Sequence, residues 1–190
     1  FHEDRRFYQK RNFMISQQKI HDAICSINPE EFDFKTQEIG GDVCVLVTPQ
    51  KMDVDWNKDN LILRSIIYRR DDYLPISIGH DKFFNHSERP HLYPDPNDYP
   101  KTWNEKTDGS LICVSKYKGH PIIRTRGVFS AFIHETGPEI EDLLNKNPNI
   151  LENDWVNSEV YTLLFEHVTP NNQIVLKYNA PELILHAARK

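Results

Sequence analysis

Residues 105–127 read EKTDGSLICVSKYKGHPIIRTRG and contain two strand-like runs. Residues 110–117 and 120–125 are rich in β-branched and other apolar side chains, which predicts two strands. Lys118 and Gly119 separate these runs, and glycine supplies the positive φ angle that a tight hairpin turn requires. The stretch therefore predicts an antiparallel β-hairpin that is entered from a polar turn.

Ahead of this hairpin the chain alternates between helical and strand patterns. Residues 15–27 repeat apolar side chains at helical spacing, which predicts an amphipathic helix. Residues 42–48, 61–68 and 73–78 are short β-branched runs bounded by Gly, Asn, Asp and Pro, and we expect each to be a strand. Residues 89–101 are rich in proline, which predicts a surface loop.

After the hairpin, three more apolar runs occupy residues 159–168, 173–178 and 183–188. The first also fits a helix capped by Ser158, but its β-branched and aromatic content favours a strand. We therefore expect strands at all three.

A second helix is predicted through Asn145, because Thr136 and Glu139 have the spacing of a capping box. Strands joined as hairpins, with few helical crossovers, indicate an α+β class built on mainly antiparallel sheets. The length of 190 residues, with 38% hydrophobic and 11% aromatic residues, fits one domain over residues 1–190.

The net charge of -5 argues against a protein that coats nucleic acid non-specifically. It leaves room for a local basic groove, for which the best candidates are Arg69, Arg70, Lys116, Lys118, Arg124 and Arg126. Solvated strand edges are the alternative explanation for these charges.

The sequence has no apolar run long enough to suggest a membrane span. Cys25, Cys44 and Cys113 lie far apart in apolar or strand-like runs, without the paired spacing of metal ligands. We expect reduced cysteines and a cytoplasmic location.

The most informative segment is residues 105–110, EKTDGS, in which Lys106 precedes a turn-forming Asp-Gly pair. A surface turn with an incidental lysine is one interpretation. A covalent nucleotidyl-transfer site is the other, and it needs a neutral amine. Because a lysine with a pKa of about 10.4 is almost entirely protonated at neutral pH, nearby cations or a metal would have to lower that pKa.

At this segment the chain resembles the covalent nucleotidyltransferases, which comprise ATP-dependent DNA ligases, RNA ligases and mRNA capping enzymes. Their Lys-x-Asp-Gly motif is similar to residues 106–109. Residues 164–168, LFEHV, resemble the family's apolar-Phe-Glu-apolar motif, and residues 173–178 resemble the strand after it. Residues 63–67, LRSII, resemble the arginine motif, although the family commonly has Gly where Ser65 stands.

Within this family the chain is most similar to the RNA ligases of T-even phages. The residues that carry this likeness are KFFN at 82–85, RTRG at 124–127 and the run from Glu166 to Asn172. The likeness spans roughly residues 61–188. It implies a nucleotidyltransferase fold, of the ATP-grasp-like ligase adenylation kind, with two sheets flanked by helices and ATP in the groove between them.

The resemblance also implies roles for individual residues. Lys106 would attack the α-phosphate of ATP and carry AMP. Glu105 would lie against the adenine, largely through its backbone. Asp108 would position the lysine and metal-bound water, with a turn-forming aspartate as the alternative. Arg64 would hold the ribose or a phosphate, with a strand-edge charge as the alternative.

Glu166 is informative without the family. In a strand it shares a face with Val160, Leu164 and Val168, and an unpaired carboxylate on an apolar face is costly. It therefore needs a partner. The resemblance suggests a ribose hydroxyl and a role with Asp108 in metal binding; a structural salt bridge is the alternative.

Two further groups of residues are candidates for ligand binding. Arg124 and Arg126 lie two residues apart, hence on one strand face, where they could meet phosphates. Tyr178 or Ile174 would pack against the base, with an ordinary core position as the alternative.

The histidines and cysteines suggest no separate chemistry. His80, His86 and His91 lack the spacing and companion ligands of a zinc site, and Cys113 has no triad partner. The sequence also has no glycine-rich phosphate loop, so ATP binding of the P-loop kind is not expected.

These observations predict an ATP-dependent RNA ligase that acts in RNA repair. It would adenylylate itself at Lys106, transfer AMP to an RNA 5′-phosphate and seal the end with a 3′-hydroxyl. ATP, Mg²⁺ or Mn²⁺, and RNA are its expected partners, and no membrane is. The alternatives are a DNA ligase, a capping-type nucleotidyltransferase, or a catalytically silent nucleotide- or RNA-binding module.

The family would continue beyond residues 183–188 to another acidic metal motif and a Lys-x-Lys strand. Neither occurs before Lys190. We therefore expect these 190 residues to adenylylate themselves slowly or not at all, unless Arg124, Arg126 and Lys177 make the phosphate contacts instead.

Overall fold

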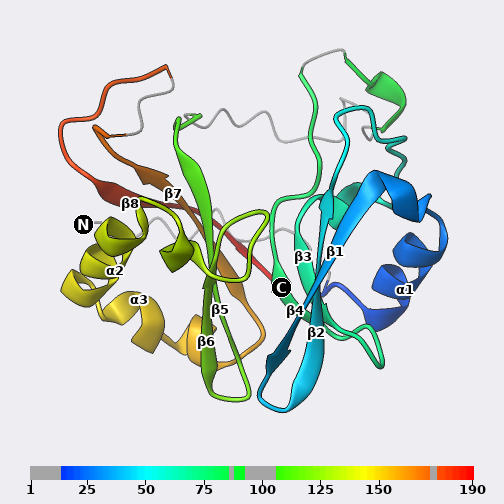
Figure 1. Cartoon of the computed structure of the whole chain (residues 1–190), viewed down its shortest axis with the longest axis horizontal. Helices are drawn as coiled ribbons and strands as arrows, with labels where there is room; N and C mark the ends of the chain where they lie inside the picture. Colours follow the sequence, from blue (N-terminus) through cyan, green and yellow to red (C-terminus); the bar gives the residue numbers. More distant parts are fainter. Residues whose placement is uncertain (1–13, 86–87, 93–105, 172–174) are drawn as a thin grey trace, which may run out of the picture.

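The computed structural model describes residues 14–85, 88–92, 106–171 and 175–190. In these residues the chain forms two four-stranded sheets that are flanked by helices (Figure 1). The strand order is β1-β2-β3-β4 in the first sheet and β6-β5-β7-β8 in the second, and each neighbouring pair is antiparallel. The predicted α+β class with antiparallel sheets is confirmed.

The first sheet contains β1 (Phe32–Ile39), β2 (Asp42–Pro49), β3 (Ile66–Arg69) and β4 (Pro75–Ile78). The second contains β5 (Ser110–Tyr117), β6 (His120–Arg124), β7 (Thr162–Val168) and β8 (Glu182–Arg189). The helices are α1 (Gln17–Cys25), α2 (Gly137–Lys146), α3 (Asn149–Glu152) and α4 (Asp154–Asn157). Short 3₁₀ helices occupy Pro29–Glu31, Leu61–Arg64 (η3), Pro90–Leu92 and Ala131–Ile133.

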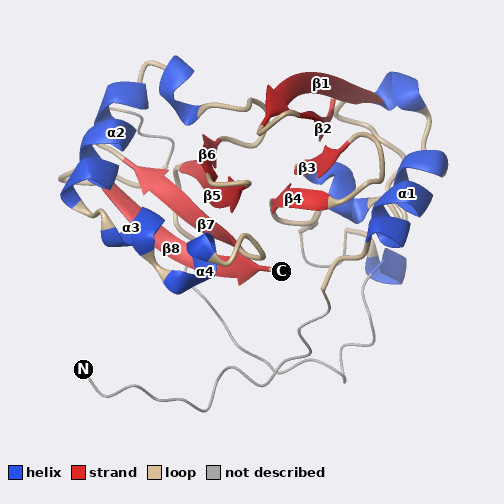
Figure 2. Ribbon diagram, turned by 90° about the horizontal axis from the view of Figure 1, so that it is seen from below, coloured by secondary structure: helices blue, strands red, loops and turns tan. Residues whose placement is uncertain are grey.

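The elements stack as helix, sheet, sheet, helix, and three apolar clusters fill the spaces between them (Figure 2). One cluster joins α1 to the first sheet, and a second joins α2 and α4 to the second sheet. The third lies between the two sheets. Because both faces of β2 are covered, its sequence VCVLV is apolar throughout: Val45 and Val47 face α1, and Cys44 and Leu46 face the second sheet.

Most of the predicted elements are present. The hairpin of β5 and β6 turns at Lys118 and Gly119, whose φ angles are 48° and 79°. α1 begins after Ser16, whose side chain accepts a hydrogen bond from the Lys19 amide. Residues 159–168 form a strand from Thr162 onward, as favoured over a helix. β8 covers the last predicted run.

Two predicted strands are wrong in whole or in part. Residues 61–64 form η3, because the side chain of Asn60 anchors a turn by donating to the Asp55 carbonyl and accepting from the Asn57 amide. Within residues 173–178, Gln173 and Ile174 lie outside the described residues, and residues 175–178 are not a strand.

Two other differences have clear causes. β1 has no counterpart in the prediction, because as an edge strand it buries only its two ends and therefore shows no apolar alternation. The capping box at α2 is also wrong: Thr136 makes no side-chain cap, and Glu139 instead accepts a hydrogen bond from Thr169 and lies 2.8 Å from His167 Nε2.

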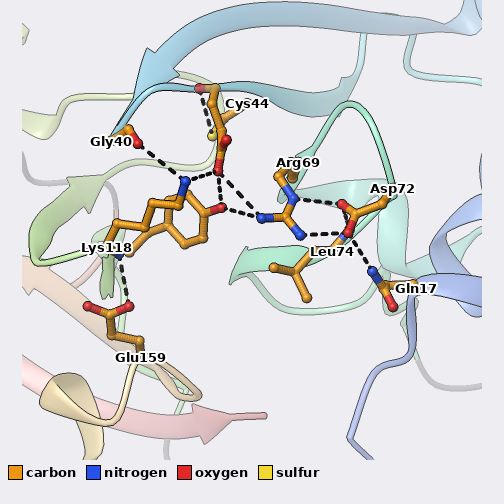
Figure 3. A network of polar contacts seen from close by, with 10 residues as sticks. Gln17, Gly40, Cys44, Arg69, Asp72, Leu74, Lys118 and Glu159 are labelled. Carbon is orange, nitrogen blue, oxygen red and sulfur yellow. Dashed lines mark hydrogen bonds and ion pairs between the residues drawn. The ribbon is translucent and has the colours of Figure 1, made fainter.

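A polar network joins the two sheets beside their hairpin turns (Figure 3). Asp42, at the start of β2, accepts hydrogen bonds from Tyr117, the last residue of β5, and from Lys118 in the turn that follows; the Lys118 Nζ–carboxylate distance is 2.8 Å. These contacts, with Lys118 foremost, lower the pKa of Asp42 to about 2. Arg69 donates to Tyr117 and, through two bonds, to Asp72.

The turn itself is held by a carboxylate. Glu159 accepts the backbone N–H groups of Lys118 and Gly119, at 2.9 Å and 2.6 Å. Figure 3 shows the Glu159 carboxylate beneath Lys118. The hairpin is therefore tied both to the first sheet and to the segment that leads into β7.

Among the described helices, none combines the length and apolar character that crossing a membrane would need.

Candidate active site

A groove of about 1740 Å³ lies between residues of both sheets. It is lined by residues of β1, η3, β5, β7, β8 and α2, by the turn before β5, and by the segments that follow β4, β6 and β7. Its charged and polar lining includes Lys35, Arg64, His80, Lys106, Thr125, Arg126, His134, Glu135, Thr136, Glu166, Asn171 and His186. Lysine and arginine outnumber glutamate in this lining, so the groove suits an anionic ligand.

Lys106 has an exposed side chain in the groove, and the three residues after it are each tied to a different segment. The Thr107 hydroxyl lies 2.8 Å from Nε2 of His186 on β8. The Asp108 amide donates to the Tyr178 hydroxyl at 3.0 Å, and the Gly109 amide donates to the Glu166 carboxylate at 3.0 Å. The turn that carries Lys106 is therefore held against the second sheet by three separate hydrogen-bonded contacts.

Gly109 is required by close packing. A Cβ atom at this position would lie 2.2 Å from the His167 carbonyl oxygen and 3.0 Å from its carbon. Any side chain here would force the turn away from β7. The glycine thus lets the backbone of residues 106–109 lie directly against the strand that carries Glu166.

Glu166 lies half-buried on β7, opposite Leu111 of β5. Burial raises the pKa of its carboxyl group, and the hydrogen bond from Gly109 opposes that rise. Its strand neighbours Leu164 and Val168 are buried as predicted, whereas Val160 lies ahead of β7 and is 43% exposed. Within the described residues Glu166 forms no salt bridge; its protein partner is the Gly109 amide.

Arg64, which precedes β3 of the first sheet, and Arg126, which follows β6 of the second sheet, both line the groove. Arg64 ends η3, and its guanidinium lies 4.5 Å from the centre of the half-exposed Phe83 ring. Burial, followed by the charge of Arg126, lowers the pKa of Arg64. Two cations that repel one another across a groove provide a place where an anion would be stabilised.

Arg124 does not reach the groove, so the prediction that it faces phosphates with Arg126 is wrong. Its side chain is fully buried, and its five N–H donors are engaged by the hydroxyl and carbonyl oxygens of Ser65 and Ser77 and by the carbonyl of Thr125. β6 ends at Arg124, so strand alternation does not extend to Arg126. Arg124 instead connects the second sheet to the first through these hydrogen bonds. The Ser65 hydroxyl also donates a hydrogen bond to the Arg126 carbonyl.

Asp108 and Tyr178 support the loop beyond β7. One Asp108 oxygen accepts the amides of Val175 and Leu176, at 2.5 Å and 3.2 Å. These amides therefore bond to a side chain rather than to a strand, which explains why residues 175–178 are irregular. Tyr178 contacts the Asp108 amide and is not part of the groove lining. Glu105 and His86 lie outside the described residues.

Several groove residues were missed from the sequence, among them Lys35, Phe83 and His186. His186 had a signal, because it is the polar residue in the apolar run 183–188. Lys35 had none, since its strand was not predicted. Within the described part of the chain, no group of three or more His, Cys, Asp or Glu side chains is placed to hold a metal ion.

A model of the T4-type RNA ligase family, described as RNA ligase, matches residues 63–190, which include every groove residue named above except Lys35. A search of curated protein sequences found no match. The match covers well over half of the chain and contains the Lys106 turn, β7 and β8. The chain therefore belongs to the RNA ligase family of the T4 type.

Proposed function

We propose that the chain is the adenylyltransferase domain of an ATP-dependent RNA ligase, with a nucleotidyltransferase fold and Lys106 as its nucleophile. One observation carries the proposal: the Lys106 side chain shares a groove with Arg64, Arg126 and the Glu166 carboxylate. A covalent nucleotidyl transfer needs an amine, cations for the phosphates and an acceptor for the sugar, and these residue types supply them.

The first step follows from this arrangement. Nζ of Lys106 forms a bond to the α-phosphorus of ATP, while the bond from that phosphorus to the bridging oxygen breaks and pyrophosphate leaves. Arg64 and Arg126 stabilise the negative charge of the phosphates. Glu166 accepts a ribose hydroxyl with the lone pairs that Gly109 leaves free.

Two further steps complete sealing. An oxygen of the RNA 5′-phosphate attacks the AMP phosphorus, and the bond to Lys106 breaks as AMP moves to the RNA. The RNA 3′-hydroxyl then attacks that 5′-phosphate and releases AMP. The groove exceeds the roughly 300–1,000 Å³ of a typical small-molecule site, which leaves space for a polynucleotide end beside the nucleotide.

The donor set fits Mg²⁺ held mainly by the substrate, because this ion commonly takes one or two carboxylates together with phosphate oxygens. Glu166 is the carboxylate suited to this role. Asp108 is less suited than the sequence suggested, since it accepts two backbone amides outside the groove lining; we assign it to holding the Lys106 turn. The ion would neutralise phosphate charge and orient pyrophosphate.

The test is covalent labelling. The chain is incubated with Mg²⁺ and ATP labelled at the α-phosphate, followed to long times, and separated by denaturing electrophoresis. We expect label on the parent and none on Lys106→Ala or Lys106→Arg, because arginine stays protonated and cannot attack. Lys146→Ala, on the exposed surface of α2, is the matched control and should label like the parent.

Label that persists on Lys106→Ala would assign the nucleophile elsewhere. ATP binding without any covalent label on the parent would favour the silent binding module. Supplying 5′-phosphorylated RNA or DNA to the labelled protein then separates an RNA ligase from a DNA ligase, since only the accepted strand takes AMP from the lysine.

A further inference from the structure

We infer that His186 is a positioning residue for Lys106 and acts through the hydroxyl of Thr107. The inference rests on the proposed function, in which Lys106 is the nucleophile. His186 lies on β8, 79 residues from Thr107 along the chain. It does not belong to the motifs that led to the proposed site.

His186 occupies a break in the pairing of β7 with β8. Phe165 pairs with Leu185 and Leu164 pairs with Ala187, so His186 is an extra residue without a partner on β7. This is a β-bulge, and bulges near active sites redirect a side chain that regular alternation would place otherwise. Here the bulge presents an exposed histidine to the groove.

The contact that His186 makes is specific. Its Nε2 lies 2.8 Å from Oγ1 of Thr107, whose side chain is nearly buried, with the residue 8% exposed. A nearly buried hydroxyl is stabilised by a hydrogen-bond partner. Because the χ1 angle of threonine is restricted, a hydrogen bond to its hydroxyl also restricts the movement of its backbone. Thr107 directly follows Lys106 in the chain. On the C-terminal side of Lys106, the contact between Thr107 and His186 is therefore the described side-chain contact closest to the lysine backbone.

The other anchors of the turn act one and two residues further on. Asp108 is held by Tyr178 and Gly109 by Glu166. If the Thr107 anchor were lost, the turn would stay attached, but the direction in which the Lys106 stem leaves it would be free to vary. A nucleophile displaced by about 1 Å can react roughly 100-fold more slowly.

The experiment is a double-mutant cycle on single-turnover labelling over a range of ATP concentrations. We expect His186→Ala and Thr107→Val each to lower the maximal labelling rate roughly 10- to 100-fold, with little change in half-saturating ATP. The double variant should be no slower than the slower single variant, because both remove the same contact. His186→Gln, whose terminal amide can reach the hydroxyl, should recover most of the rate.

His120→Ala, an exposed histidine on β6, is the matched control and should label like the parent. A normal rate for Thr107→Val, or losses that multiply in the double variant, would overturn the inference, since His186 would then act on the substrate directly. A matching rise in half-saturating ATP would also overturn it in favour of a binding role.

A second measurement does not depend on activity. Amide hydrogen exchange without ATP should speed up for residues 107–109 in His186→Ala, while the rest of β5 and the melting temperature stay as in the parent. If the parent never labels, the proposed function fails, yet this exchange still decides whether His186 holds the turn. Unchanged exchange at residues 107–109 would show that it does not.

Discussion

Glu166 combines two interactions that a pair of substitutions can separate. Its carboxylate holds the Gly109 amide and also faces the groove. We expect Glu166→Ala to slow labelling roughly 10- to 100-fold, because a hydrogen bond to a charged group is worth about 1.5–3 kcal/mol. Glu166→Gln keeps an acceptor for Gly109 but not the charge, so a rate near that of the parent would show that holding the turn is its main role.

The control for this prediction is Glu141→Ala, on the exposed face of α2. If Glu166→Ala labels like the parent and only its stability falls, the carboxylate serves structure alone.

The sequence could identify Glu166, since a carboxylate in an apolar strand needs a partner. It could not identify Gly109 as that partner, because the pairing of β5 with β7 joins segments 57 residues apart.

The two arginines of the β6 segment show a further limit of sequence patterns. Arg124 and Arg126 have strand spacing, and alternation would place them on one face. The strand ends between them, so Arg124 is buried between the sheets and Arg126 lies in the groove. Element boundaries are the least reliable part of a sequence-based prediction, and here one boundary decides which arginine meets a ligand.

The Lys106 turn and β7 form one packed unit, and Gly109 is the point of closest approach. We predict that Gly109→Ala lowers the free energy of unfolding by about 1–3 kcal/mol, since its methyl group would overlap the His167 carbonyl. It should also slow labelling, because the turn must move away from Glu166. Urea unfolding and single-turnover labelling measure the two effects.

Gly127→Ala is the stability control, because a Cβ atom there would meet nothing within 4 Å. Equal stability of Gly109→Ala and the parent would mean that the turn shifts at no cost.

The hairpin of β5 and β6 was predictable because its turn needs a glycine and its strands are regular. β1 was not, since its exposed edge position removes the alternation on which such predictions depend.

The stability of the whole chain should depend on pH through two histidines. Burial, followed by the charge of Arg64, lowers the pKa of His80 from 6.5 to about 4, and burial lowers the pKa of His167. Between pH 6.5 and about 4 the unfolded chain therefore binds protons that the folded chain does not. Above the pKa that each histidine has in the unfolded chain, neither histidine reduces the free energy of unfolding. As the pH falls below that pKa, the free energy of unfolding decreases.

Urea unfolding across this pH range tests the prediction. His80→Gln should show a smaller loss of stability on acidification than the parent, whereas His120→Gln, at an exposed position, should follow the parent. The raised pKa of Glu166 acts in the opposite sense, because its folded form holds a proton to higher pH. A His80→Gln curve parallel to that of the parent would assign the dependence to other groups.

The carboxylate of Glu159 has a consequence for cutting or extending this chain. Exposed loop tips usually tolerate insertions and new termini, and the turn at Lys118 and Gly119 is such a tip. Its amides, however, are bound by Glu159, and the Lys118 side chain crosses to the other sheet. We therefore expect a tag inserted at Met52, which is fully exposed, to disturb the groove less than one inserted at this turn.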